Sequence, residues 1–525
     1  MPSPITIADS CGTNRPGRNL LVVLSVFASF FSYAALAAPV PGVNEPHYLC
    51  KALHYWHPDW CAGDFFLESK NAHTVFYLTV GSLTNWLPLD QAAWCGRLLA
   101  TAILAWGWCH LLGRFHSCRW FPLQACWLFL LLASCGNFSG EWLVGGVEGK
   151  VFSYGFLFGA LGEFQRFHTL RASVLAGLAV AFHPVIGVWG LMAFVGDLCI
   201  QRIWNWRQGV PRSVSSAEPS LKTGLAVVAL GISALPGLLP VFLLLTESAP
   251  ARTRSEAVYI QVYYRLAHHL DPMVFPSRSY LGYTELILLW LVLIRVCCSS
   301  MPHRQFNRIV AWSILFAIAG IIIGWGPRPA SQMPWYTLRA QLLKFYPFRL
   351  ADVLTPIAAS MAIVGWLQSR RGLLWSVCAI ALIASLAKGP SNVEVNRYSG
   401  ELRKDWIDAC QWIDDNLPRN ALIQTPHNGW AFKWFAHRPE FVSFKDCPQD
   451  AAGIVEWNRR LQFLTKWFQS HYADEFYSAE ELRDLRSRTG ISHIFTDRLG
   501  PLELEPVFAN DSFQIYDLTS LDQNP

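Results

Sequence analysis

Apolar residues are gathered along this chain into runs that are as long as a lipid bilayer is thick. A helix needs about 20 consecutive apolar residues to cross the hydrocarbon core of a membrane. The pattern therefore predicts a polytopic α-helical membrane protein with about 11 transmembrane helices. The predicted spans cover residues 19–41, 92–113, 119–136, 151–165, 171–183, 185–200, 223–246, 282–299, 309–326, 350–368 and 372–388.

Three places in this pattern allow a second interpretation. Runs 171–183 and 185–200 are short and meet at Pro184, which would break a continuous helix, so we predict two spans rather than one kinked span. Segment 74–90 could be a further span, but it would invert everything after it, and we predict a helix that grazes the membrane. The first run is too long for a signal-peptide core, although residues 35–42 resemble a cleavage site.

Short basic segments alternate with long segments of mixed charge. Lys and Arg are enriched in cytoplasmic loops, which predicts a cytoplasmic N-terminus and an extracytoplasmic side for everything after residue 388. The outer loops are then 42–72, 137–150, 247–281 and 327–349. The basic segments lie at 14–18, 113–119, 165–171, 201–212, 301–308 and 369–372.

The pattern changes after residue 388, where charges become dense and apolar positions become periodic. Amphipathic helices are predicted at 401–418, 451–472 and 478–490, the last with a capping box of Ser478 and Glu481. Strands are predicted at 420–426, 440–445, 491–497 and 512–518. We therefore divide the chain into a transmembrane domain, 1–388, with the long first outer loop 42–72, and a small soluble α/β domain, 389–525.

Composition supports a membrane protein and excludes several other classes. Hydrophobic residues make up 52% and charged residues 15% of the 525 positions, whereas a soluble protein carries about 25% charged residues. The 24 Trp suit membrane–water interfaces. A net charge of +5 is too small for a nucleic-acid binder, so no nucleic-acid partner is expected.

The positions of the cysteines do not decide whether any of them form disulfides. Most of the 14 Cys lie in or beside spans, where a free Cys behaves as a small apolar residue. Cys50 with Cys61, and Cys410 with Cys447, could form disulfides if these regions are extracytoplasmic.

Charged residues beside the membrane are candidates for chemistry. Glu45 follows the first span, at the start of a helix that Asn44 could cap with Pro46 in its first turn. Its carboxylate could act as a base or hold a divalent cation; alternatively, it is a helix-terminal charge satisfied by the dipole. Glu148 and Lys150 lie, with Glu141, among five glycines at 140–155, where the backbone can approach a ligand. The alternative is a tight turn in which Glu148 pairs with Lys150.

Two further outer segments carry candidate ligand-binding residues. Arg265 lies three residues before His268, on the same face if the segment is helical. The side chains of His268, His269 and Asp271 could ligate a metal, although Asp271 before a proline could simply cap a turn. The second segment is basic on the side where Lys and Arg are normally sparse, and it alternates apolar anchors with basic heads, as an interfacial helix does. Guanidinium groups match phosphate geometry, so we expect an anionic lipid headgroup there, with snorkelling to lipid phosphate as the alternative. Its cations are Arg328, Arg339, Lys344 and Arg349.

The topology, the acidic first loop, the basic segment before a late span and the outer C-terminal domain together resemble the GT-C superfamily. These polytopic glycosyltransferases include oligosaccharyltransferases, protein mannosyltransferases and aminoarabinose transferases. The resemblance implies a bacterial inner-membrane protein whose donor is a sugar on a polyprenyl phosphate. It also implies that Glu45, in VNEPHYL, is the catalytic first-loop acid and that Arg349, in FYPFRLAD, binds donor phosphate. The family often has two adjacent acids in that loop, whereas Glu45 is followed by Pro46.

The resulting hypothesis is transfer of a sugar from a polyprenyl-phosphate donor to an extracytoplasmic acceptor. Glu45 would orient or deprotonate the acceptor hydroxyl, while Lys344, Arg349 and Arg265 stabilise the leaving phosphate. The partners are then membrane lipid, the lipid-linked sugar and an acceptor that the sequence does not name. No cofactor is specified, and a divalent cation is an option. The alternatives are a carrier, flippase or assembly scaffold for lipid-linked glycans, and a family member that has lost its chemistry.

Overall fold

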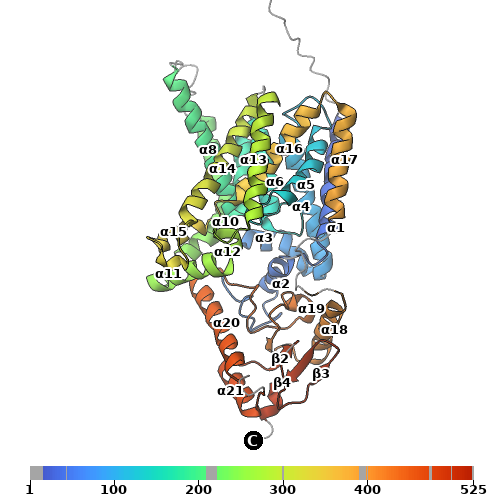
Figure 1. Cartoon of the computed structure of the whole chain (residues 1–525), viewed down its shortest axis with the longest axis vertical. Coiled ribbons are helices and arrows are strands. Elements are labelled where there is room, and N and C mark those ends of the chain that lie inside the picture. The colour runs from blue at the N-terminus through green and yellow to red at the C-terminus, as the bar shows by residue number, and fades with distance from the viewer. Residues whose placement is uncertain are drawn as a thin grey trace, which may run out of the picture.

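Helices dominate the structure, a computed structural model that describes residues 16–42, 44–208, 221–246, 248–297, 301–388, 398, 400–471, 476–497 and 499–522. A helix occupies each of the predicted apolar runs, and these helices stand side by side as a bundle (Figure 1). They are α1 (Pro16–Ala37), α4 (Leu89–Leu112), α5 (Phe121–Cys135), α6 (Gly149–Phe164), α7 (Thr169–Phe182), α8 (Pro184–Arg207), α10 (Leu221–Leu245), α13 (Ser277–Cys297), α14 (Met301–Gly324), α16 (Arg349–Leu367) and α17 (Arg371–Ala387).

The bundle has the length and surface of an integral multi-pass membrane protein. Within the described residues, 7 helices are long and apolar enough to cross a membrane, namely α1, α4, α8, α10, α13, α14 and α16. Helices α5, α7 and α17 are apolar but shorter, and α6, with 16 residues, is almost wholly buried. Large apolar side chains cover the outside of the bundle, as on α10, where Ile232 is 68% exposed. Water would not tolerate so much apolar surface, whereas lipid does.

The two ambiguous segments resolve into short or separate helices. The chain breaks between α7 and α8 at His183, whose extended backbone precedes Pro184, and two helices result as predicted. Segment 74–90 forms α3 (Thr74–Leu78) and a 3-10 helix, η2 (Val80–Asn85). At 1.5–2 Å of rise per residue, neither is long enough to cross a bilayer.

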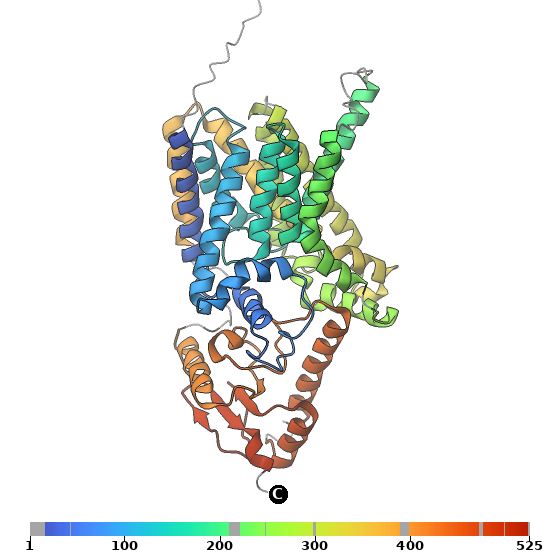
Figure 2. The same cartoon turned by 180° about the vertical axis from the view of Figure 1, so that it is seen from behind.

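The long connections of the bundle gather at one end. Several short connections, including the turn between α16 and α17, lie at the opposite end, away from the C-terminal region (Figures 1 and 2). The one-residue break at His183 lies at the end facing that region, beside Arg349. The long connections carry α2 (Lys51–Trp56), α3, α11 (Ala251–Ile260), α12 (Ala267–Leu270) and α15 (Tyr336–Leu343), all at the end facing that region. All four predicted outer loops therefore share one end of the bundle.

The C-terminal region contains helices and a four-stranded sheet. Its helices are α18 (Gly400–Asn416), α19 (Phe432–Ala436), α20 (Ala451–His471) and α21 (Ala479–Thr489), the last with the predicted capping box. The sheet has the order β1-β2-β4-β3, with β1 parallel to β2 and the other pairs antiparallel. Its strands are β1 (Ile423–Gln424), β2 (His493–Thr496), β3 (Phe508–Ala509) and β4 (Gln514–Asp517).

Two details of this region differ from the sequence prediction. Residues 440–445 do not form a strand, because only Glu440 pairs with the sheet, through a bridge to Ile423. Strand β3 was not predicted, because two residues are too few to show the alternation of apolar and polar positions that marks a strand. The predicted domain boundary falls within 389–397, outside the described residues.

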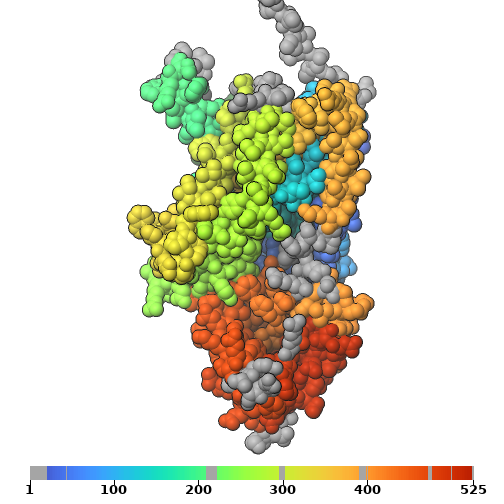
Figure 3. All heavy atoms as spheres, in the orientation of Figure 1, coloured from blue at the N-terminus to red at the C-terminus, as the bar shows by residue number. Residues whose placement is uncertain are grey.

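The C-terminal region packs directly on the outer loops (Figure 3). Helix α20 lies against α11, and Ala257 and Ile260 share a buried cluster with Trp457 and Leu464. Lys433 of α19 forms ion pairs with Asp64 of the first outer loop, at 3.4 Å, and with Glu440 and Asp446. The C-terminal region therefore shares an apolar core with the outer loop that carries α11, and a buried charge network with the first outer loop.

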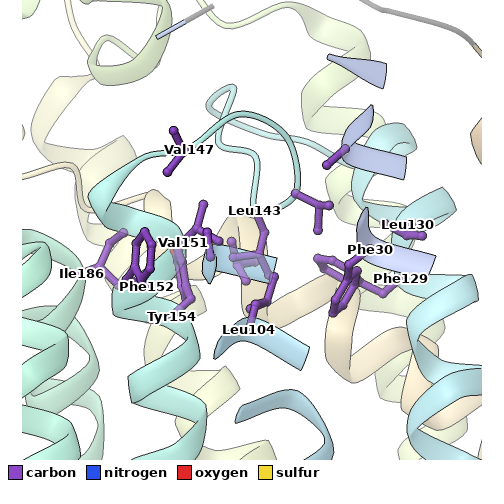
Figure 4. Close-up of a cluster of buried hydrophobic side chains, with 14 of the residues drawn as sticks. Phe30, Leu104, Phe129, Leu130, Leu143, Val147, Val151, Phe152, Tyr154 and Ile186 are labelled. Carbon is purple, nitrogen blue, oxygen red and sulfur yellow. The ribbon is translucent and has the colours of Figure 1, made fainter. Parts of the chain in front are cut away.

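Glycines let the central helices approach closely. A Cβ atom on Gly107 of α4 would lie 2.1 Å from the carbonyl oxygen of Gly155 of α6, so the two backbones are in contact, as in small-residue packing of membrane helices. Residues 137–148, between α5 and α6, form a glycine-rich loop. Its Leu143 lies beside Leu104 and Val151 in the buried core (Figure 4). The loop is thus anchored into the bundle.

Candidate functional site

Two helices of the bundle begin beside each other at its outer end. Helix α6 begins at Gly149 and α16 at Arg349, and the hydroxyl of Tyr154 donates to the Arg349 carbonyl at 3.1 Å. Each helix carries a cation in its first turn, Lys150 and Arg349. Unpaired N–H groups and the helix dipole make both N-termini positive. Positive charge is therefore concentrated where the two helices meet.

The carboxylate of Glu141 lies between these two cations. Its Oε2 is 2.7 Å from Arg349 Nε, and its Oε1 is 3.4 Å from Lys150 Nζ. Glu148 adds a second carboxylate, 3.4 Å from Lys150 Nζ. Both acids come from the glycine-rich loop that precedes α6. The predicted pairing of Glu148 with Lys150 is present, but it is one contact in a larger network.

The network continues into the first outer loop and the C-terminal region. Asn44 Nδ2 donates to Glu148 Oε1 at 2.6 Å, and Lys445 Nζ donates to Asn44 Oδ1 at 2.8 Å. Arg265 Nη2 donates to the Lys445 carbonyl at 2.7 Å. Five segments that are distant in sequence therefore converge, when Arg349 at the start of α16 is included. We call this set the Arg349 cluster; its members are Asn44, Glu141, Glu148, Lys150, Arg265, Arg349 and Lys445.

The cluster carries more positive than negative charge. The side chains of Lys150, Arg265, Arg349 and Lys445 face only Glu141 and Glu148 within it. Burial, together with the positive charge of nearby Arg265, lowers the pKa of Lys445 to about 8. A cation is costly to bury without a full counter-charge. The electrostatics of the cluster therefore favour an additional anion.

Several polar atoms of the cluster have no hydrogen-bond partner. Within the described part of the chain, these buried atoms are Glu141 Oε1, Arg265 Nε and Arg349 Nε. Arg349 Nε is close to Glu141 but is not aligned for a hydrogen bond. Buried polar groups are almost always hydrogen-bonded in native proteins, and exceptions gather at functional sites. The two arginine donors in particular could bind a ligand oxygen.

The glycine-rich loop is held rigidly above the cluster. Asp352, one turn into α16, accepts from the backbone amides of Phe138 and Ser139 at 2.9 and 2.8 Å. Farther along the loop, Val147 N donates to Glu45 Oε1 at 2.8 Å. The loop therefore has a fixed carboxylate anchor at each end, which positions Glu141 and Glu148.

Glu45 is completely buried and fully engaged. Its two oxygens accept from Nε and Nη2 of Arg97, both at 2.7 Å, and from the amides of Gly42 and Val147. A general base must have a lone pair within reach of the proton that it removes. In this structure both oxygens are occupied by these four donors, and the role of Glu45 as the base stays a prediction. Asn44 differs from expectation, because its side chain joins the cluster and does not cap the helix.

Histidines 268 and 269 lie at the edge of the cluster without forming a metal site. His269 Nδ1 is 2.5 Å from the Ser139 carbonyl, and the two imidazole rings are 4.0 Å apart. Asp271 is instead paired with Arg328. Over the residues that the structure describes, no group of three or more His, Cys, Asp or Glu side chains could hold a metal ion.

The cations of the basic segment 328–349 differ in what they contact: some contact only nearby parts of the chain, and one belongs to the Arg349 cluster. Arg328 and Arg339 donate to the last carbonyls of α14, including Gly324 and Ile323, at 3.0 and 2.9 Å. Lys344 lies against the ring of Phe345 at the end of α15 and contacts no residue of the cluster. The predicted interfacial helix through 342–350 is interrupted, since α15 ends at Leu343 and Tyr346 has a left-handed backbone (φ 55°). Of the predicted phosphate binders in this segment, only Arg349 reaches the cluster.

Sequence reasoning missed three important residues. Lys445 lies in a segment predicted as a strand, so its approach to Asn44 was not visible. Glu141 was noted but given no site role. Arg97 is a charge inside an apolar run, which is itself a signal of a buried partner, and that partner is Glu45. The four cysteines considered for disulfides, Cys50, Cys61, Cys410 and Cys447, are all unbonded.

Comparison with protein families gives one partial match. Residues 404–464 match a domain of unknown function, DUF6798. This stretch includes most of α18, strand β1, helix α19, Lys445 and the first part of α20. No curated protein matches the chain.

Comparison with solved structures returns ArnT from Cupriavidus metallidurans. The crystal structure bound to undecaprenyl phosphate has 12% identity and a TM-score of 0.41, covering 96% of this chain and 99% of that chain. The apo structure has 13% identity and a TM-score of 0.38, covering 96% and 98%. ArnT is a GT-C glycosyltransferase, the class that the sequence resembles. Identities and TM-scores this low carry no argument about the function of this chain.

Proposed function

We propose that this chain is a membrane glycosyltransferase that binds the phosphate of a polyprenyl-phosphate sugar at the Arg349 cluster. The observation that carries the proposal is the meeting of two helix N-termini and an excess of buried cations at one end of an apolar bundle. Helix N-termini bind phosphate through their free amides and dipole. Guanidinium groups add bidentate contacts to phosphate oxygens. The lipid-exposed surface of the bundle suits an isoprenoid chain.

The donor phosphate would lie beside Glu141, between Arg349 and Lys150. Both cations already hold a carboxylate there, at 2.7 and 3.4 Å, so the position is suited to an anion. The Nε atoms of Arg349 and Arg265, neither of which makes a hydrogen bond in the structure, would donate to phosphate oxygens. Lys445 would add a further positive charge from the C-terminal region. Of the predicted binders, Arg349, Lys150 and Arg265 keep this role, and His268 and His269 are edge residues.

Glycosyl transfer at this site requires a base and a stabilised leaving group. The acceptor hydroxyl oxygen attacks the anomeric carbon, and the bond from that carbon to the phosphate oxygen breaks with its electron pair on phosphate. The cations stabilise this charge through preorganised electrostatics. We assign the base to Glu148, in place of Glu45, since its Oε2 has only the long contact of 3.4 Å to Lys150 Nζ. Glu148 then receives the acceptor proton.

The orientation of the protein in the membrane is inferred from where the basic connections of the helix bundle lie. The short basic connections at 113–119, 165–171 and 369–372 lie away from the cluster (Figure 1), and such loops are normally cytoplasmic. We therefore propose that the cluster and the C-terminal region face the extracytoplasmic side, in a bacterial inner membrane. A carrier, flippase or scaffold would use the same cluster to bind phosphate without breaking a bond.

The test measures binding and donor cleavage separately. Full-length protein in nanodiscs is titrated with a polyprenyl phosphate, and polyprenyl-phosphate-linked hexoses and pentoses are then incubated with it and a membrane extract as acceptor. We expect saturable binding and release of free polyprenyl phosphate, with release lost in Glu148→Gln while binding remains. Binding with the donor always intact would replace the transferase with a carrier or scaffold. Absence of polyprenyl-phosphate binding would overturn both functions.

A further inference from the structure

A cavity lies in the C-terminal region, outside the Arg349 cluster. This cavity, of about 300 Å³, opens between the sheet and α20. It is lined by the residues that follow the two parallel strands, including Thr425 and His427 after β1 and Asp497 after β2. The carboxyl ends of parallel strands lie at one edge of a sheet, and ligands of α/β proteins bind there. The cavity volume is at the lower end of the range for ligand sites.

Gln424, the last residue of β1, places a buried polar atom without a partner next to this cavity. The side chain lines the cavity and is only 8% exposed. Its Nε2 donates to the Thr425 carbonyl at 2.8 Å, which fixes the orientation of the amide. Its Oε1 is buried without a hydrogen-bond partner among the described residues. An unpaired buried amide oxygen is costly, so polar capacity that the protein itself does not use lies next to the cavity.

The chemistry of the lining indicates which class of ligand fits. The carboxylate of Asp497 is part of the lining that the structure describes, and it repels an anionic ligand. Asp497, Thr465 and Ser443 supply carboxylate and hydroxyl groups, while Phe444 and Phe468 supply apolar faces. A pyranose ring combines several hydroxyl groups with apolar C–H faces. We propose that the cavity binds a neutral, hydroxyl-rich small molecule of the size of one sugar residue.

The cavity adjoins the Arg349 cluster through a single segment of chain. Phe444 forms part of the cavity wall, and Arg265 packs on its ring with 5.2 Å between the guanidinium carbon and the ring centroid. The next residue, Lys445, belongs to the cluster. Binding in the cavity does not depend on the proposed transfer. Only the further role of its occupant, as the acceptor end of a glycan, rests on the proposed function.

The experiment measures sugar binding to the full chain without any lipid donor. Saturation-transfer NMR is recorded on nanodisc-embedded protein with glucose, galactose, mannose and N-acetylglucosamine, and with glucose 6-phosphate as the anionic comparison. Thr465 is exposed and lines the cavity, so Thr465→Trp fills it from the solvent side. Lys466 is the exposed neighbour outside the lining, so Lys466→Trp is the matched control.

We expect at least one neutral sugar to bind, and Thr465→Trp to weaken its binding at least 10-fold while Lys466→Trp leaves it unchanged. Asp497→Asn, which changes charge with little change of volume, is expected to weaken the same sugar several-fold and provides a readout that does not depend on filling the cavity. Three results would each overturn the proposal: no neutral sugar binds, the phosphorylated sugar binds more tightly than the neutral one, or both tryptophan variants behave alike.

Discussion

Glu141 Oε2 lies 2.7 Å from Nε of Arg349, and this contact fixes an acid at the point where two helix N-termini meet. The same carboxylate is 3.4 Å from Lys150 Nζ through its other oxygen. Glu141 thus occupies part of the volume that we assign to the donor phosphate. A bound phosphate and Glu141 would compete for the same cations, so the acid controls how tightly the lipid headgroup is held.

Replacing this acid with its neutral isostere is expected to tighten phosphate binding. Glu141→Gln removes a like charge near the phosphate, an interaction on the order of 1–4 kcal/mol at about 4 Å in partly exposed surroundings. We expect the dissociation constant for a polyprenyl phosphate to fall by about 10-fold. Binding is measured by titration in nanodiscs at fixed ionic strength, with Glu401→Gln on exposed α18 as the control. Weaker binding in Glu141→Gln would mean that Glu141 positions the cations and does not compete with phosphate.

Arg349 and Lys344 are expected to behave differently although both were predicted to bind phosphate. A hydrogen bond to a charged group contributes about 1.5–3 kcal/mol, so Arg349→Gln is expected to weaken polyprenyl-phosphate binding by about 10- to 100-fold. Lys344→Gln is expected to change it less than about twofold, because Lys344 contacts only the neighbouring ring. The same titration, with thermal melting to confirm folding, compares the two variants. Equal losses of polyprenyl-phosphate binding in the two variants would mean that Lys344 also binds the phosphate.

The two residues also show what the sequence could and could not predict. Apolar run length located every helix of the bundle, because burial in lipid demands continuous apolar segments. Arg349 was identified because a basic residue before a late span is unusual on the outer side. Lys344 looked equivalent in sequence, and only the end of α15 at Leu343 and the turn at Tyr346 separate them.

Contacts between distant segments could not be predicted from the sequence pattern. Asn44 and Lys445 are 401 positions apart, and their hydrogen bond depends on how the C-terminal region docks on the first loop. Glu45 was assigned to catalysis because it is acidic and near the membrane, but the decisive fact is that Arg97 points at it from α4. Pairing of this kind follows from helix packing, which apolar periodicity does not encode.

The charge of Lys445 is expected to make phosphate binding depend on pH. Burial and Arg265 lower the pKa of its amine to about 8, so the cation is present below pH 8 and is lost as the pH rises above it. We expect polyprenyl-phosphate binding to weaken several-fold between about pH 7 and pH 9, and Lys445→Arg to lose most of this dependence because arginine stays charged. Titrations at several pH values check this. An unchanged profile in Lys445→Arg would assign the dependence to another group.

Stability responds to Lys445 in the opposite direction, which keeps the two effects separable. An unfolded lysine has a pKa of about 10.4, so between about pH 8 and pH 10 the unfolded chain holds more protons than the folded chain at this residue. The free energy of unfolding therefore gains with pH from Lys445 in that range. Weaker phosphate binding there is then not a consequence of unfolding by this group.

The ion pair between Glu45 and Arg97 is expected to govern stability and not chemistry. Both side chains are inaccessible to solvent, and removing one partner of a buried pair costs about 3–5 kcal/mol. We expect Glu45→Gln and Arg97→Met each to lower the melting temperature of the purified protein by several degrees. The double variant is expected to melt higher than either single variant. In it no unpaired charge remains, and the single carbonyl oxygen of the carboxamide can still accept from the amide of either Gly42 or Val147, which donate to different oxygens of Glu45.

Sugar transfer by the double variant separates the two roles of Glu45. If Glu45 only anchors the first loop to the glycine-rich loop, transfer recovers together with the melting temperature, since Glu141, Glu148 and Arg349 return to their places. If Glu45 is the base, the double variant is folded but inactive, because a glutamine cannot accept the proton. Release of free polyprenyl phosphate from the sugar donor, compared between the double variant and Glu148→Gln, decides which carboxylate takes part in the reaction.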